Sequence, residues 1–208
     1  MTETFDVVRK RIEESIAVKR SFPEELIQNI ALAAEAIVDS YDKGGKLILF
    51  GNGGSAADAQ HIACELVGRF LRERRALEAI SLSANASVLT CLGNDYGYER
   101  VFERQIEAAA KAGDVVVGLS TSGNSQNVLR ALKRARKIGC TTVCMTGHSG
   151  GKMKRFADVL LNVPSNVTPR IQESHVLIGH IICELVESQA RVLSPQRVAD
   201  PGRKERKR

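Results

Sequence analysis

A short apolar run that breaks at a glycine loop and continues into an alanine-rich helix occupies residues 46–66, and it constrains the fold more than any other segment. Residues 47–50 are apolar without polar alternation, which is typical of a strand buried on both faces. In the loop Gly51–Gly54, three glycines permit positive φ and a close approach of the backbone to a ligand. We expect Ser55 to cap the helix. Unpaired backbone N–H groups at such a helix N-terminus form an anion site, so this segment predicts a phosphate-binding loop.

The predicted helix after this loop carries an imidazole and a carboxylate. His61 and Glu65 are four residues apart, so they share one helix face a turn beyond the anion site. An imidazole and a carboxylate beside a phosphate cradle indicate chemistry on a phosphorylated small molecule. On spacing alone a surface ion pair explains the two residues equally well, and this alternative stays open.

A second candidate phosphate loop, Ser120–Ser125, leaves another buried apolar run and precedes another predicted helix. It offers four hydroxyls and several backbone N–H groups, and each can donate a hydrogen bond to a phosphate oxygen. An ordinary Ser/Thr-rich turn with an N-cap needs only one hydroxyl, so we favour phosphate binding. This loop is neither a Walker A loop nor a G-x-G-x-x-G fingerprint. Both loops follow buried strands and open helices, so they could line one crevice.

The last predicted helix carries polar residues in an otherwise apolar context. Gln172 and His180 lie two turns apart and within about 80° around the helix, so both can face one cavity. Three isoleucines flank His180, which predicts that it is buried and needs a binding partner, a metal or a catalytic role. His175 lies about 60° to the other side of Gln172. Spacing alone does not choose between the two histidines.

Strands alternate with helices along most of the chain, which predicts an α/β fold with a doubly wound parallel sheet and helices on both faces. The expected strands are residues 47–50, 79–82, 114–119, 140–146 and 159–163, and the expected helices after them are residues 55–72, 87–92, 99–111, 126–138 and 169–191. Asn94 and Asp95 fall in a predicted glycine turn, where ordinary turn chemistry competes with hydrogen bonding to a sugar.

Two further helices, residues 3–20 and 22–41, are expected before the first strand. Ser21 is the expected N-cap of the second helix, and Glu24 would complete a capping box. Both helices are amphipathic, and a single α/β layer does not need both. We therefore interpret residues 1–43 as contributing to an oligomer surface.

Length and composition predict one folded domain, residues 1–194, and a disordered basic tail, residues 195–208, that lacks the apolar content to fold. Residues 197–208 carry +4 of the net charge of +6, so we expect no nucleic-acid partner. No apolar run reaches the length of a membrane span and the polar start is not a signal peptide, which predicts a cytoplasmic protein without a membrane partner. Five cysteines without a C-x-x-C pair are interpreted as reduced, mostly buried thiols.

Four motifs resemble, in this order, those of the sugar isomerase (SIS) domain family: Gly51-Asn52-Gly53-Gly54-Ser55, Gly93-Asn94-Asp95, Ser120-Thr121-Ser122-Gly123-Asn124-Ser125 and Arg170-Ile171-Gln172-Glu173. The resemblance covers residues 1 to about 193 and is closest to the family's isomerases of phosphorylated heptoses. It implies a flavodoxin-like three-layer fold and a cytoplasmic homotetramer with active sites between subunits. It also implies conversion of D-sedoheptulose 7-phosphate to D-glycero-D-manno-heptose 7-phosphate. This aldose–ketose isomerisation begins the synthesis of the heptose of lipopolysaccharide core or a related glycan.

The resemblance also assigns residues to roles. The implied substrate contacts are Asn52, Gly53, Gly54, Ser55, Glu65, Asn94, Asp95, Ser120, Thr121, Ser122, Ser125 and Gln172. The implied ligands of one zinc ion per subunit are His61, Glu65, Gln172 and His180. Pro169 stands where some family members have Asp, so a polar role at that position does not transfer.

The implied reaction moves a proton between C1 and C2 of the sugar through a cis-enediol. Glu65 is our choice for the base that takes the carbon-bound proton, and His180 for the acid that protonates the sugar oxygen. The zinc ion would polarise the carbonyl and hydroxyl oxygens. Metal ligation and acid/base work compete for the same lone pairs on these two residues.

Three alternatives remain. A non-catalytic SIS protein that binds the replication initiator needs the oligomer surface but not the polar cavity, so the polar set argues against it. An isomerase of another sugar phosphate, such as arabinose 5-phosphate or a hexose phosphate, differs too little to be separated by its loops. A nucleic-acid binder rests on the basic tail alone.

Overall fold

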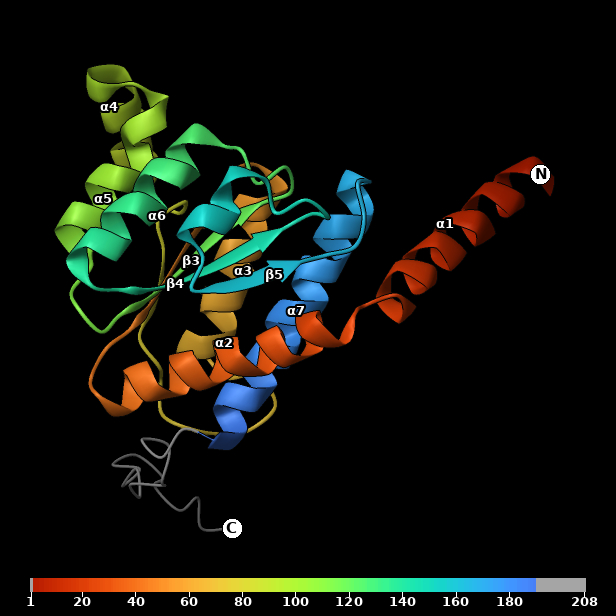
Figure 1. The fold of residues 1–208 in the computed structure, drawn as a ribbon, viewed down its shortest axis with the longest axis horizontal. Helices are drawn as coiled ribbons and strands as arrows, with labels where there is room; N and C mark the ends of the chain where they lie inside the picture. The colour runs from red at the N-terminus through yellow and green to blue at the C-terminus, as the bar shows by residue number, and fades with distance from the viewer. Residues whose placement is uncertain (1, 190–208) are drawn as a thin grey trace, which may run out of the picture.

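Five parallel strands form a single sheet in the computed structural model, which describes residues 2–189 (Figure 1). Their bounds are β1 Leu47–Gly51, β2 Ala79–Ser81, β3 Val115–Ser120, β4 Thr141–Thr146 and β5 Val159–Asn162. The order across the sheet is β2-β1-β3-β4-β5, so the chain moves from β1 to one side and then crosses to the other. The strand order therefore reverses between β1 and β3. In open α/β sheets, ligands bind at this point, outside the carboxyl ends of the strands.

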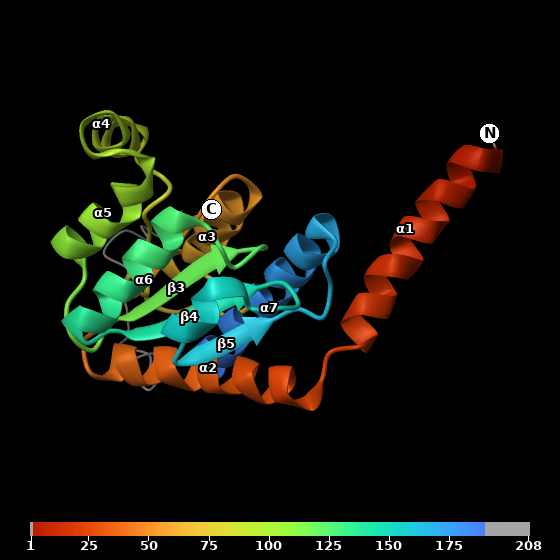
Figure 2. The same cartoon turned by 45° about the horizontal axis from the view of Figure 1, so that its top comes forward.

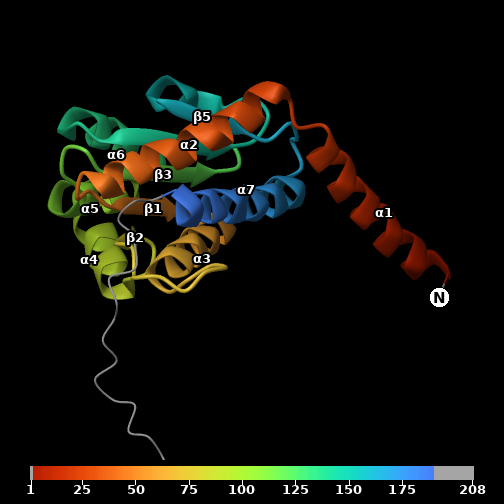
Figure 3. The same cartoon turned by 90° about the horizontal axis from the view of Figure 1, so that it is seen from below.

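Helices cover both faces of the sheet, and strand β1 shows why its sequence lacks polar alternation. One face is covered by α2 (Glu24–Asp42), α3 (Gly54–Val67) and α7 (Thr168–Gln189), and the other by α5 (Val101–Ala109) and α6 (Gln126–Ile138) (Figures 2 and 3). Leu47 and Leu49 belong to the core on the first face, whereas Ile48 and Phe50 belong to the core on the second. Every β1 residue is buried, as the unbroken apolar run predicts.

Helix α1 (Thr2–Arg20) extends away from the three-layer body (Figures 1 and 2). Its apolar side chains Phe5, Val8, Ile12 and Ile16 recur at helical spacing and are all exposed. The guanidinium of Arg170 ties α1 to α7 by donating to the Arg11 carbonyl oxygen at 2.7 Å. The assignment of this helix to an oligomer surface stays a prediction.

Two predicted helix caps are wrong. The Ser21 hydroxyl does not cap α2, because it donates to the Val18 carbonyl oxygen at the end of α1 and α2 begins after Pro23. Ser55 does not cap α3, because the helix begins one residue earlier, after Gly53. The φ of Gly53 is +56°, which glycine adopts without steric cost, and Ser55 is buried in the first turn.

Two predicted helix boundaries differ most from the structure. The helix expected to reach residue 72 ends at Val67, and an irregular segment follows as far as β2. Asn94 and Asp95 lie in helix α4 (Ala86–Tyr96) rather than in a turn. The Asn85 side chain caps α4 by accepting a hydrogen bond from the backbone N–H of Val88, and the helix continues until Gly97, at φ +83°.

The predicted α/β fold, with a doubly wound parallel sheet, helices on both faces and two N-terminal helices, is confirmed. Among the described helices, none is long and apolar enough to cross a membrane. The five cysteines are free, with Cys140, Cys144 and Cys183 buried and the other two exposed. The predicted tail, residues 195–208, lies outside the described residues, and the domain limit at residue 194 stays a prediction.

Candidate active site

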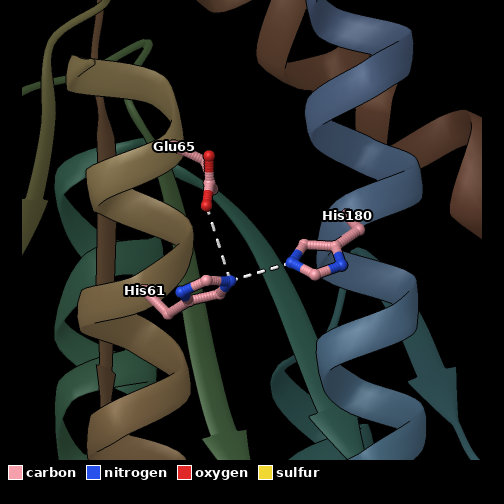
Figure 4. A group of neighbouring side chains, drawn as sticks. All are labelled: His61, Glu65 and His180. Carbon is pink, nitrogen blue, oxygen red and sulfur yellow. Dashed lines mark hydrogen bonds and ion pairs between the residues drawn. The ribbon is translucent and has the colours of Figure 1, made fainter. Parts of the chain in front are cut away.

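Helices α3 and α7 bring three candidate metal ligands together (Figure 4). His61 and Glu65 come from α3, and His180 comes from α7. Nε2 of His61 lies 2.8 Å from Nε2 of His180 and 3.6 Å from Oε1 of Glu65. The ligand atoms of the three residues all lie within 4.8 Å of one another. The pair that spacing alone could explain as a surface ion pair is therefore joined by a third group from a distant part of the chain.

Two glycines allow α3 and α7 to pack closely. A Cβ atom on Gly54 of α3 would overlap the side-chain amide of Gln172 on α7. A Cβ atom on Gly179 of α7 would lie 2.7 Å from the side chain of Ile62 on α3. Because the first contact lies near both helix N-termini and the second lies further along both helices, α3 and α7 run parallel to each other.

The cluster is a candidate metal site whose donor chemistry suits zinc. With zinc–nitrogen bonds near 2 Å, a tetrahedral site places neighbouring ligand atoms roughly 3.3 Å apart. The observed separations of 2.8 and 3.6 Å lie on either side of that value. Two imidazoles and one carboxylate are also a known donor set of catalytic zinc sites, which keep one position open. Gln172, the fourth implied ligand, lies against Gly54, about two helical turns before His61, so its part in the metal site stays a prediction.

The glycine loop is held by a side-chain network that the sequence did not reveal. Asn52 and Asn127 exchange two hydrogen bonds, at 2.8 and 3.0 Å, and the Tyr98 hydroxyl donates to Oδ1 of Asn52 at 3.1 Å. Asn127 is buried in the first turn of α6, where its Oδ1 also accepts the backbone N–H of Val128 at 2.9 Å. The side chain of Asn52 is thereby fixed from two separate segments of the chain.

The hydroxyls of the serine loop face one another at the end of β3. Ser120 Oγ lies 3.0 Å from Ser125 Oγ and 3.4 Å from Ser122 Oγ. Ser125 is the N-cap residue of α6, but its side chain accepts no helix N–H group. The hydroxyls are therefore not used for capping, and donors at this helix N-terminus remain for an anion. Because β1 and β3 are adjacent and parallel, the glycine and serine loops both lie at the point where the strand order reverses.

A cavity of about 180 Å³ opens beside the serine loop. It is lined by Thr121, Ser122, Gly147, His148, Ser149, Asn166, Thr168 and Ile171. Hydroxyl, amide and imidazole groups of this kind can hydrogen-bond a phosphorylated sugar. The sequence motifs singled out Thr121 and Ser122 of this set, but not His148. The lining residues come from three segments that only the folded sheet brings together.

The two histidines of α7 have different surroundings. His175 is fully buried, and its Nε2 lies 3.2 Å from the Thr146 carbonyl oxygen. Burial lowers the pKa of His175 to about 4, against the opposing effect of the hydrogen bond to Thr146. His180 is only partly buried and packs between the rings of His61 and Phe70. The neutral core histidine is therefore separate from the metal-ligand cluster.

Asn94 and Asp95 are exposed on α4 and hydrogen-bond within their own helix. The Asn94 amide donates to Oδ1 of Asp95 at 2.8 Å, and the Cys91 thiol donates to Oδ2 of Asp95 at 3.5 Å. Neither side chain is joined to the glycine or serine loop by these bonds. Their contact with a substrate stays a prediction.

The fold, the two switch-point loops and the ligand cluster define a sugar-phosphate-binding α/β domain of the SIS class. The SIS domain family matches residues 12–147. Two curated relatives are phosphoheptose isomerases: that of Aquifex aeolicus is 54% identical over 86% of this chain and 94% of its own length, and that of Citrifermentans bemidjiense is 53% identical over 88% and 95%.

Solved structures agree with these relatives. A phosphoheptose isomerase from Neisseria gonorrhoeae superposes with a TM-score of 0.85 at 42% identity, covering 89% of this chain and 100% of that one. The enzyme from Francisella tularensis gives a TM-score of 0.86 at 34% identity, covering 89% and 99%. This chain therefore belongs to the phosphoheptose isomerase family of SIS-domain proteins.

Proposed function

We propose that this chain is an aldose–ketose isomerase that converts D-sedoheptulose 7-phosphate to D-glycero-D-manno-heptose 7-phosphate. The observation that carries this proposal is the cluster of His61, Glu65 and His180, which lies along the helix that leaves the glycine loop. A set of groups suited to acid/base chemistry and metal ligation, one helical stretch beyond a glycine loop, supports chemistry on a phosphorylated substrate. The family's phosphoheptose isomerases, at about half identity, support the choice of substrate.

In the proposed reaction, Glu65 removes a proton from C1 of the open-chain ketose while His180 gives a proton to the carbonyl oxygen on C2. The resulting enediol takes a proton back at C2 and loses the proton of the C1 hydroxyl, which leaves the aldehyde. A zinc ion held by His61, Glu65 and His180, with Gln172 as the implied fourth ligand, would supply Lewis-acid stabilisation of negative charge on the two oxygens. A given lone pair on either residue can go to a proton or to the metal, so ligation and proton transfer compete for the same atoms.

The phosphate group is assigned to the serine loop, where the hydroxyls of Ser120, Ser122 and Ser125 converge. Thr121 lines the neighbouring cavity. The remaining proposed contacts lie in or around the glycine loop: Asn52, Gly53, Gly54, Ser55 and Gln172. Hydroxyls and backbone amides suit a phosphate monoester, since each can donate a hydrogen bond to its oxygens without carrying a fixed charge.

The quaternary structure is proposed to be a homotetramer with active sites between subunits. The exposed apolar side chains of α1 support it, because an unpartnered stripe of this kind needs a covering surface. Asn94 and Asp95, on the exposed helix α4, would then contact a substrate that is bound between this subunit and a neighbouring one. Residues 1–194 are proposed to form one domain, and the protein to act in the cytoplasm, supplying heptose for lipopolysaccharide core or a related glycan.

Isomerase turnover on sedoheptulose 7-phosphate, measured together with bound zinc, tests this function. We expect the wild type to be active and Glu65→Gln and His180→Gln to lose at least a hundredfold in kcat while remaining folded. Glu35→Gln, which alters an exposed carboxylate on α2, is the matched control and should keep full activity.

Three outcomes would contradict the proposal in different ways. A folded, zinc-loaded wild type without turnover would exclude the heptose substrate and direct attention to other sugar phosphates. A wild type that also binds no sugar phosphate would favour a non-catalytic SIS protein. Unchanged kcat in both variants would exclude Glu65 and His180 as the acid and base.

A further inference from the structure

A buried ion pair joins the segment after α3 to the end of α7. The side chains of Arg74 and Glu187 are 2% and 1% exposed, and Arg74 Nε lies 2.9 Å from Glu187 Oε1. The Glu187 carboxylate also accepts the backbone N–H groups of Phe70, Leu71 and Arg72 at 2.7 to 3.1 Å. Burial alone would raise the pKa of Glu187, but these N–H groups and the charge on Arg74 hold it below its ordinary value. The carboxylate is therefore ionised and fully hydrogen-bonded.

The other end of the guanidinium caps helix α3. Arg74 Nη2 donates to the Glu65 carbonyl oxygen at 2.7 Å, and Nη1 donates to the carbonyl oxygens of Leu66 and Gly68 at 2.7 and 3.2 Å. The last carbonyl groups of a helix have no partner within the helix, and a cation at this end is also favoured by the helix dipole. Arg74 thus fixes the turn of α3 that carries Glu65.

The carboxylate acts on the α7 side of the ligand cluster. Glu187 follows His180 by seven residues, two turns further along the same face of α7. Its hydrogen bond to the Phe70 N–H fixes a residue whose ring packs 5.3 Å from the ring of His180. One ion pair therefore restrains the backbone at Glu65 and the ring of His180 from outside the cluster.

We propose that Arg74 and Glu187 are positioning residues that hold Glu65 and His180 at ligating distance from His61. The inference rests on the proposed function in taking this cluster as the metal and acid/base site. Stability alone explains a buried ion pair poorly, because desolvation largely offsets the attraction and apolar side chains of similar volume commonly serve as well. A restraint on ligand geometry needs the directional bonds that only the charged pair supplies.

The test compares Glu187→Gln with Asp114→Asn. Asp114 forms the other strongly buried ion pair of the described chain, 2.9 Å from Lys46 Nζ, at the amino end of the sheet and away from the cluster. For each variant we would measure the zinc dissociation constant by competition with a chromogenic chelator, kcat and KM, and the melting temperature. We expect Glu187→Gln to weaken zinc binding and kcat by 10- to 100-fold with KM within about twofold. Asp114→Asn should lower only the melting temperature.

Arg74→Lys gives a second variant in case Glu187→Gln unfolds. Lysine keeps the charge but not the planar fork that reaches four carbonyl oxygens and the carboxylate, so an intermediate loss of zinc affinity is expected. Wild-type zinc affinity and kcat in folded Glu187→Gln or Arg74→Lys would overturn the inference while leaving the proposed function intact. Equal losses of zinc affinity in Asp114→Asn would also overturn it. A wild type that binds no zinc would overturn the metal assignment and this inference together.

Discussion

At the scale of single residues, five positions on α7 separate two histidines with opposite chemistry. His175 faces the core, where burial keeps it neutral, and His180 faces α3, where it meets another imidazole. Spacing alone allows either histidine to lie near the helix face that carries Gln172, so the sequence did not show which of the two belongs to the site. The choice depends on what packs against each side of the helix, which is a property of the folded sheet.

The buried state of His175 predicts a pH dependence of stability. Its folded pKa of about 4 lies below the ordinary value of 6.5, so between these values the unfolded chain binds a proton that the folded protein does not. The stabilisation is complete above pH 6.5 and is lost as the pH falls toward 4, by on the order of 3 kcal/mol. Urea unfolding across this range should show a steeper loss in the wild type than in His175→Gln. Parallel curves for the two proteins would refute the assignment.

At the scale of elements, the serine loop depends on a glycine that packs against another loop. Gly123 has φ +64°, and a Cβ atom there would overlap the carbonyl oxygen of Gly150. Gly44, after α2, has φ +75° but open space around its missing Cβ. Alanine substitutions at the two positions therefore separate two contributions to the loss of stability: the strain of a left-handed backbone, and the displacement of a neighbouring loop.

We predict that Gly44→Ala loses about 1–2 kcal/mol of unfolding free energy, from the left-handed backbone alone, with KM unchanged. Gly123→Ala should lose more stability and raise KM for the sugar phosphate at least tenfold. The added methyl group would overlap the Gly150 carbonyl oxygen and so force the serine loop away from the loop at residues 147–151. Urea denaturation and steady-state kinetics on both variants check this. A normal KM in Gly123→Ala would show that the serine loop does not bind the phosphate.

Strands and helices that follow from a local sequence pattern were predictable from the sequence. Side-chain contacts between segments far apart in the chain were not. The strands at residues 47–50 and 114–119 were found because unbroken apolar runs follow from burial on both faces. The caps at Ser21 and Ser55 were wrong because a hydroxyl can donate backward or be buried as easily as it can cap. The Asn52–Asn127 and Arg74–Glu187 contacts join residues 75 and 113 positions apart, so no local pattern signals them.

At the scale of the whole molecule, helix α1 projects from the three-layer body and leaves its apolar side chains uncovered (Figure 1). Its exposed side chains include Phe5, Ile12 and Ile16, and the helix projects outward (Figure 1). Ordering such a helix alone in water is marginal, so its stability must come from packing against another surface. A second copy of the chain supplies that surface in the proposed tetramer.

Ile12→Glu should therefore shift the protein to smaller species in sedimentation velocity and reduce turnover at least tenfold, since the active sites are proposed to lie between subunits. Lys10→Ala, about 200° around the helix from Ile12, is the control and should leave both unchanged. A wild type that sediments as a monomer, or a fully active monomeric Ile12→Glu, would contradict the proposed assembly.

The parallel packing of α3 and α7 has a consequence for chain length. Gly54 on α3 lies against Gln172 on α7, and His61 on α3 lies against His180 on α7. The two contacts therefore fix the alignment of one helix along the other. Deleting one residue from either helix between these contacts would turn everything beyond it by about 100° and move it by about 1.5 Å. Apart from Gly179, which the close approach to Ile62 requires, substitutions between the contacts keep this alignment, whereas any change in the number of residues breaks it. At the other positions of these two stretches, the count of residues is under stronger constraint than their identity.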